Sequence, residues 1–170
     1  MKFASNVNQQ RASTNNNTMR NIRVDLTDFD LESVYNEVIA AEKVIPHALL
    51  MDWNFDALKF DRMQKFAILY KIFKPHFALT KVPLPTFGAF LQKVEHLYSR
   101  NKNPFHNFDH GVMVCHAANL LMYRVKKFSR LLDDKLRFAF VLAALGHDLD
   151  HPGRNNNFEI NSNSKLALRY

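Results

Sequence analysis

FAFVLAALGHDLDHPG, residues 138–153, joins an uninterrupted apolar run to a cluster of ionisable side chains. The run Phe138–Leu145 is typical of a helix buried on most of its circumference. A charged group buried beside such a helix is costly unless it is paired, hydrogen-bonded or bound to a metal. The cluster after Gly146 therefore predicts a metal site at the end of this helix.

The two ionisable residues at the start of the cluster, His147 and Asp148, are adjacent in sequence. Adjacent side chains on a helix diverge by about 100°, so the pair can converge on one ion only where the helix ends or bends. Pro152 and Gly153 supply a stop signal just beyond them. His151, four residues after His147, can return to the same side as a residue that orients the ligands.

A second cluster, PFHNFDH at residues 104–110, strengthens the metal hypothesis. Its histidines His106 and His110 are four residues apart, which places both on one face of a helix. A histidine pair on one helix is more often structural than functional, and the same holds for a lone His-Asp dipeptide. Together, the pair and the dipeptide predict one site built from His110, His147 and Asp148, with His106 nearby.

Composition favours an all-α fold. The chain has 170 residues, 47% of them hydrophobic, and only 4 glycines and 6 prolines, so it has few of the breaks that a many-turned β fold needs. Apolar periodicity and caps predict helices over residues 31–45, 58–73, from a cap at Thr86, 106–128, from Asp133 to 145, and 165–170.

Three segments are expected along the chain. Residues 1–28 are polar and Asn-rich with no apolar period, so a disordered tail is expected there. Residues 29–52 hold an amphipathic pattern that Pro46 ends, which fits a linker or a leading helix. Residues 53–170 carry both histidine clusters and form the main domain.

Charge and cysteine usage limit the partners. The net charge is +7, but the basic residues are dispersed and no aromatic-basic alternation marks a nucleic-acid platform, so no nucleic acid is expected. No apolar run reaches the length of a membrane span, and no continuous apolar stretch follows Met1-Lys2-Phe3, so neither a membrane span nor a secretory signal is expected. The single cysteine, Cys115, excludes an internal disulfide and fits a reducing compartment, which favours a cytoplasmic location.

Three strings in the chain carry a family resemblance: FHNFDH at 105–110, HDLDHPGRNNNFEIN at 147–161 and LALRY at 166–170. In this order and at this interval they resemble the catalytic domain of class I cyclic-nucleotide phosphodiesterases, and the resemblance runs from about residue 53 to 170. It implies a multi-helix, HD-type fold and the metal-dependent hydrolysis of 3′,5′-cyclic nucleotides, cAMP or cGMP, to 5′-monophosphates in signal transduction.

The resemblance also implies a role for each residue of the two clusters. His110, His147 and Asp148 match metal ligands, with Zn²⁺ at the tighter site and Mg²⁺ (or Mn²⁺) at the wetter one. Asp148 is the candidate to bridge the two ions. His106 matches the proton donor to the leaving O3′, and His151 matches a residue oriented towards the water ligands of the metal ions.

The chain departs from the family pattern in three ways. Phe105 stands where many members have Tyr, and Met113 where many have Asp, both tolerable in a cGMP-preferring branch. The family's fourth protein ligand, an aspartate, and its purine-clamping glutamine and phenylalanine lie in a later portion that these 170 residues do not contain. The chain is therefore expected to be the N-terminal part of the domain, truncated before its C-terminal helices and inactive alone.

Two alternatives of other classes stay open. One is a broader HD-type phosphohydrolase that acts on nucleotides without a cyclic phosphate. The other is a non-catalytic helical module that keeps the motifs but acts by binding partners. The choice between cAMP and cGMP, the oligomeric state and any regulation are open at this stage.

Overall fold

The computed structural model describes residues 31–169, which form helices joined by turns, with no strand among these residues. The all-α prediction is thus confirmed, while the predicted tail at 1–28 lies outside the described residues. The α-helices are α2 (Leu31–Val44), α3 (Arg62–Phe73), α4 (Phe77–Thr80), α5 (Leu84–Ser99), α6 (Phe108–Arg124), α7 (Lys126–Leu131), α8 (Asp134–Gly146) and α9 (Asn156–Asn161). Short 3₁₀ helices connect them at η1 (His47–Met51), η2 (Ala57–Lys59) and η3 (Lys74–His76).

Local capping decides where several helices begin. Asp61 and Gln64 form a capping box at α3, with each side chain accepting a backbone N–H of the other at 2.8 and 2.9 Å, so α3 starts at residue 62 rather than 58. Asp133 caps α8 as expected. Helix α5 starts at Leu84, with Pro85 in its first turn. Thr86 is therefore inside the helix, and the predicted cap there was wrong.

Two helix predictions need correction. The helix predicted over 106–128 is α6, which begins after its cap Asn107 and stops at Val125, whose extended backbone separates it from α7. The helix predicted over 165–170 is a set of turns as far as residue 169, in which Ser164 Oγ accepts the Ala167 N–H at 3.1 Å. A further short helix, α9, begins after its cap Asn155.

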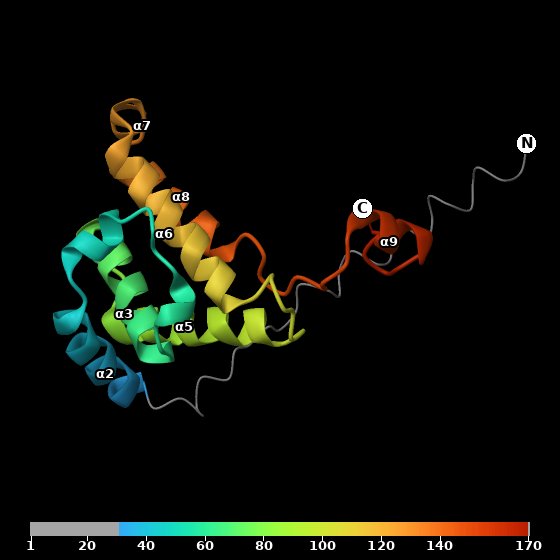
Figure 1. The fold of residues 1–170 in the computed structure, drawn as a ribbon, viewed down its shortest axis with the longest axis horizontal. Helices are drawn as coiled ribbons and strands as arrows, with labels where there is room; N and C mark the ends of the chain where they lie inside the picture. Colours follow the sequence, from blue (N-terminus) through green and yellow to red (C-terminus); the bar gives the residue numbers. More distant parts are fainter. Residues whose placement is uncertain (1–30, 170) are drawn as a thin grey trace, which may run out of the picture.

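The helices pack around α3, α5, α6 and α8 (Figure 1). Helix α6 runs along α8 and also contacts α3 and α5, while α2 packs on α3 and α5. The side chains at the centre are almost fully buried apolar ones: Phe66, Leu69, Ile72, Phe73, Leu91, Val94, Val112, Leu120, Val141 and Leu145. Burying this apolar surface is the main favourable contribution to the fold, and it fixes the two helix ends that carry the histidine clusters.

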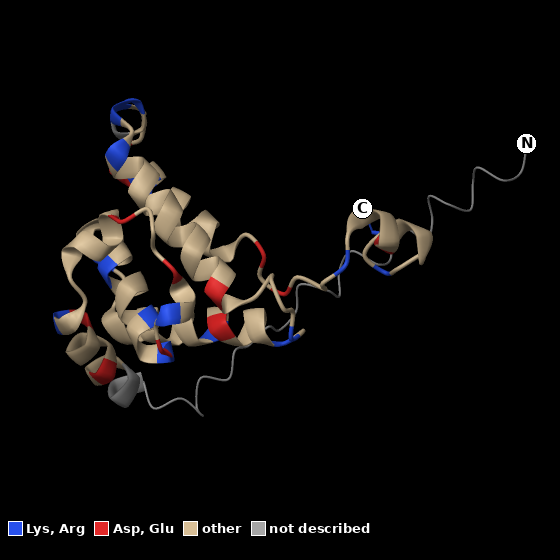
Figure 2. Cartoon of the chain, viewed as in Figure 1, with Lys and Arg blue, Asp and Glu red and all other residues tan. Residues whose placement is uncertain are grey.

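Ion pairs add connections at the edge of this core. Arg62 of α3 binds the Glu95 carboxylate of α5 through Nε and Nη2, at 2.7–2.9 Å. Lys65 of α3 pairs with Asp109 in the first turn of α6. Figure 2 shows Lys and Arg spread over several elements, with a group on α7. Among the described residues, no helix has both the length and the apolar character needed to cross a membrane.

Helix α9 and the turns after it extend away from the packed helices (Figure 1). Large apolar side chains in this segment are solvent-exposed: Phe158, Ile160, Leu166 and Leu168. Glu159 is the buried residue of α9. The end of the described chain therefore presents apolar surface that the helices of the core do not cover.

Candidate metal centre

The donor side chains come from two helix ends that the core brings together. Asn107 caps α6 by accepting the His110 N–H at 3.2 Å, which places His110 in the first helical turn. Helix α8 ends at Gly146, so His147 is its C-cap and Asp148 lies in the turn beyond. The helix thus ends next to the two adjacent ligands, as expected, and it does so at Gly146 rather than at Pro152.

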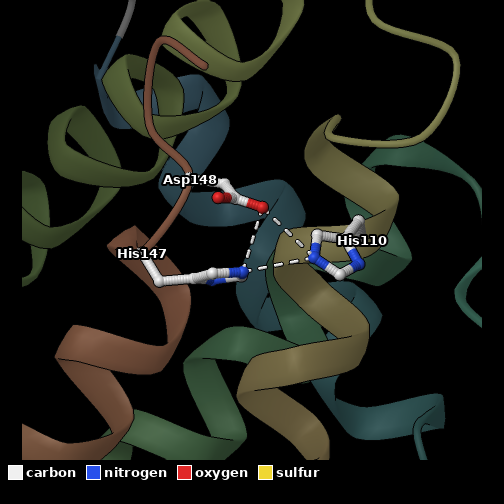
Figure 3. A group of neighbouring side chains, drawn as sticks. All are labelled: His110, His147 and Asp148. Carbon is white, nitrogen blue, oxygen red and sulfur yellow. Dashed lines mark hydrogen bonds and ion pairs between the residues drawn. The ribbon is translucent and has the colours of Figure 1, made fainter. Parts of the chain in front are cut away.

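Three donor atoms from these residues form a compact triangle (Figure 3). The Nε2 atoms of His110 and His147 are 3.2 Å apart. Asp148 Oδ2 is 3.3 Å from the first and 3.1 Å from the second. The structure therefore brings together the three residues predicted as ligands, from positions 37 residues apart along the chain.

The edge lengths of the triangle fit a tetrahedral ion. Ligand atoms bound about 2.0–2.1 Å from tetrahedral Zn²⁺ lie about 3.3–3.4 Å from one another. The observed edges of 3.1–3.3 Å are close to that value. Imidazole nitrogen and carboxylate oxygen are also ligand types that zinc accepts, so these residues suit it in both chemistry and spacing.

A hydrogen bond sets the tautomer of His147. Its Nδ1 lies 2.9 Å from the carbonyl oxygen of Ala144. Because a carbonyl only accepts, Nδ1 donates this hydrogen bond, and the other ring nitrogen, Nε2, is the one that faces the triangle. This is the backbone contact by which proteins commonly orient a metal-binding histidine.

The surroundings of His110 favour its neutral form, which is the form that can bind a cation. Burial, followed by the neighbouring His147, lowers the pKa of His110, and these effects outweigh the opposite influence of Asp148. Its side chain is 17% exposed, as is that of Asp148. A neutral imidazole is the form that coordinates metal, so the environment favours the ligand state of His110.

His106 lies beside the triangle but not on α6. It precedes the cap Asn107, so the expectation that His106 and His110 share a helix face was wrong, yet their ring centroids are only 5.8 Å apart. His106 stacks on His151, with centroids 4.1 Å apart and planes 15° from parallel. His151 Nδ1 in turn accepts the Gly153 N–H at 3.0 Å. The structure therefore pairs His151 with His106.

Asparagine amides tie the His106 segment to the His151 segment. Asn103 Nδ2 donates to the His151 carbonyl at 2.6 Å and lies 3.4 Å from the His106 carbonyl. Asn101 Nδ2 donates to the same His151 carbonyl at 2.9 Å. Asp150, in the left-handed region with φ of 61°, pairs with Arg100. The backbone at the two stacked rings is thus held by the segment that follows α5.

Tyr98, in the last turn of α5, also contacts the metal centre. It is 1% exposed, and its hydroxyl donates to the Leu145 carbonyl at 2.8 Å and accepts the Asp148 N–H at 3.4 Å. Burial raises its pKa to about 12, which keeps the hydroxyl protonated as a donor. Sequence reasoning missed Tyr98 and the asparagines, since their partners lie 47–50 residues away. Their only local signal is a buried aromatic and a polar turn before Pro104.

Fold and site together define a helical protein with a candidate metal centre of two histidines and an aspartate. Residues 105–170 match the family model described as 3′5′-cyclic nucleotide phosphodiesterase. This match covers every residue of the triangle together with both stacked histidines. The chain is therefore a partial match to the catalytic domain of the 3′,5′-cyclic-nucleotide phosphodiesterases.

Curated relatives agree with this partial match. The chain is 36% identical over 126 residues to 3′,5′-cyclic-AMP phosphodiesterase 4 of Dictyostelium discoideum, covering 71% of this chain and 12% of the relative. It is 30% identical over 125 residues to the human dual-specificity calcium/calmodulin-dependent 3′,5′-cyclic nucleotide phosphodiesterase 1C, covering 69% and 17%. It is 22% identical to the cGMP-specific 3′,5′-cyclic phosphodiesterase delta of Plasmodium falciparum, covering 100% and 21%. The chain thus spans 12–21% of the length of these relatives.

Proposed function

We propose that this chain supplies the metal-binding part of a catalytic domain that hydrolyses 3′,5′-cyclic nucleotides to 5′-monophosphates. The observation that carries the proposal is the triangle of two imidazole nitrogens and one carboxylate oxygen, with a third imidazole 5.8 Å from His110 by ring centroid. A cyclic phosphodiester is anionic and has a poor leaving group, so its hydrolysis needs charge neutralisation and a proton donor. The site offers residue types suited to both.

His110, His147 and Asp148 are the proposed ligands, with Zn²⁺ in the triangle. Asp148 directs Oδ2 at the two histidines, and its other carboxylate oxygen is the proposed ligand of a second ion, Mg²⁺ or Mn²⁺, which prefers oxygen ligands. When bound, such ions neutralise phosphate charge and make water a better nucleophile at neutral pH. The chain's own contribution is to hold the three donors at fixed spacing.

His106 is the proposed proton donor to the leaving O3′ oxygen. Its ring lies next to the triangle and stacks on His151, and its carbonyl faces the Asn103 amide. These contacts restrict the orientation of the ring, and His106 is not one of the three proposed ligands. We propose His151 as the residue that orients His106, which places it one step further from the ions than the family resemblance implied.

The deciding experiment compares His106→Ala with His110→Ala in a catalytically complete domain. His106→Ala should lower turnover by about 10²–10⁴-fold and retain zinc, whereas His110→Ala should release zinc. Equal zinc loss in the two variants would make His106 a ligand and would refute the proton-donor role. Retained zinc in His110→Ala would refute the triangle as the metal site.

Substrates separate the proposed function from its alternatives. Turnover of deoxynucleoside triphosphates without turnover of cAMP or cGMP would indicate a broader phosphohydrolase. A complete domain that binds no zinc would indicate a non-catalytic module. We further propose that the 170-residue chain alone lacks enzyme-like turnover, because the fourth protein ligand and the purine clamp that the family resemblance implies are not among its residues. We also propose a cytoplasmic location, which the single, buried Cys115 supports.

A further inference from the structure

Tyr98 contacts both segments that carry the donor triangle, although its own helix contributes no donor. Its ring packs on α6 at Gly111, the residue directly after His110, where a Cβ would lie 2.8 Å from the ring atoms Cε2 and Cζ. Its hydroxyl reaches the other segment, at Leu145 and Asp148. One buried side chain of α5 therefore spans the gap between α6 and the end of α8.

The hydroxyl acts at the point where α8 stops. The last carbonyls of a helix have no partner within the helix, and Tyr98 satisfies that of Leu145 at 2.8 Å. The same oxygen accepts the backbone N–H of Asp148, 3.4 Å away, in the turn that follows. His147 lies between these two contacts. The hydroxyl thus fixes the backbone at both ends of the short segment in which adjacent ligands must converge.

We propose that Tyr98 is a positioning residue for the metal centre, whose hydroxyl holds the Leu145–Asp148 segment in the conformation that directs His147 Nε2 and Asp148 Oδ2 at His110 Nε2. This proposal rests on the metal site of the proposed function. The ring and the hydroxyl have separable tasks. The ring fills the core against Gly111, while the hydroxyl sets ligand geometry, so removal of the oxygen alone should affect metal binding more than folding.

The test measures zinc affinity in the 170-residue chain and its Tyr98→Phe variant, by competition with a chromogenic chelator, and records the visible spectrum with Co²⁺ in place of zinc. Tyr98→Phe should bind zinc about 10–100-fold more weakly, the usual cost of losing a residue that orients a metal ligand. Its Co²⁺ spectrum should change, and its far-ultraviolet circular dichroism should not. Tyr70→Phe is the matched control, since Tyr70 is a buried tyrosine on α3 at 6% exposure. It should leave zinc affinity unchanged.

Three results would overturn the proposal. Wild-type zinc affinity in Tyr98→Phe would show that the hydroxyl does not position the ligands. Loss of helical content in that variant, or an equal loss of affinity in Tyr70→Phe, would show a purely structural role. The variant His110→Ala tests the metal site on which the proposal rests. Unchanged zinc affinity in His110→Ala means that the metal site itself is misplaced. Lost affinity in His110→Ala together with unchanged affinity in Tyr98→Phe refutes only the role of Tyr98.

Discussion

The close contact between Gly111 and Tyr98 gives a stability prediction that two glycines can test against each other. Gly111 of α6 and Gly88 of α5 are both buried helical positions. Alanine at either position should add about 1 kcal/mol to the free energy of unfolding, because its helix propensity is higher than that of glycine. At Gly88 an added Cβ meets nothing within 4 Å, whereas at Gly111 it lies 2.8 Å from two ring atoms of Tyr98. The difference between the two variants therefore isolates the packing cost.

That cost can be bounded. Real Cβ atoms essentially never come closer than 3.0 Å to such neighbours, and the Tyr98 ring is 1% exposed, so it has little room to move. Overpacking a core in this way costs about 1–3 kcal/mol. Gly88→Ala should thus raise the free energy of unfolding by about 1 kcal/mol. The free energy of unfolding of Gly111→Ala should be about 1–3 kcal/mol lower than that of Gly88→Ala.

Thermal and urea unfolding, followed by circular dichroism, measure this difference. For a chain of this size, about 2 kcal/mol corresponds to about 4–8 °C in Tm. Zinc affinity should fall in Gly111→Ala as well, because the displaced ring carries the hydroxyl away from Leu145. Equal stability in the two alanine variants would refute the close packing of Tyr98 on α6, and with it the ring contact on which the positioning argument depends.

The other predictions concern single residues. Asp148→Ala in a complete domain should reduce turnover well beyond tenfold, and steady-state kinetics showing activity within about tenfold of wild type, or about 1.4 kcal/mol of barrier, would contradict its role as a ligand. In the same complete domain, Asn103→Ala should lower kcat on the order of tenfold with a smaller change in KM, because the His106 and His151 backbones lose a shared donor; an unchanged kcat would contradict this. Burial lowers the pKa of His76 in the folded chain. Below about pH 6.5 the unfolded chain therefore binds the proton more tightly than the folded chain does, and the free energy of unfolding falls. Above that pH the contribution of the neutral His76 to stability is complete. Urea unfolding at about pH 7.5 and 5.5 should therefore show a smaller pH dependence in His76→Phe, and an equal dependence would refute this assignment.

The fold was predictable where local chemistry sets it. The apolar run before Gly146, the Asp133 cap and the proline after α2 each act within a few residues, so helix identity followed from the sequence. The convergence of His147 and Asp148 at a helix end also followed, because adjacent side chains on a helix cannot meet. The start of α6 did not follow, because the spacing of His106 and His110 does not indicate that Asn107 caps the helix after His106.

The supporting contacts of the site could not be predicted, because they depend on tertiary packing. Nothing local to Tyr98 indicates that its hydroxyl reaches Leu145, 47 residues later, and nothing local to Asn103 indicates the His151 carbonyl, 48 residues later. Similarly, the stack of His106 on His151 depends on how two loops meet. The donor residues have side-chain types that identify them, whereas the residues that orient them are recognised only by position.

The burial of Cys115 gives the protein an intrinsic reporter of opening. Its thiol is fully buried on α6 and contacts the Val141 carbonyl of α8 at 3.6 Å, and burial raises its pKa, so the reactive thiolate is suppressed in the closed state. It is the single cysteine of the sequence. A maleimide reagent can therefore label the chain only when α6 and α8 separate. The rate of labelling, with and without zinc, would measure how strongly an ion bound between these two helices holds them together.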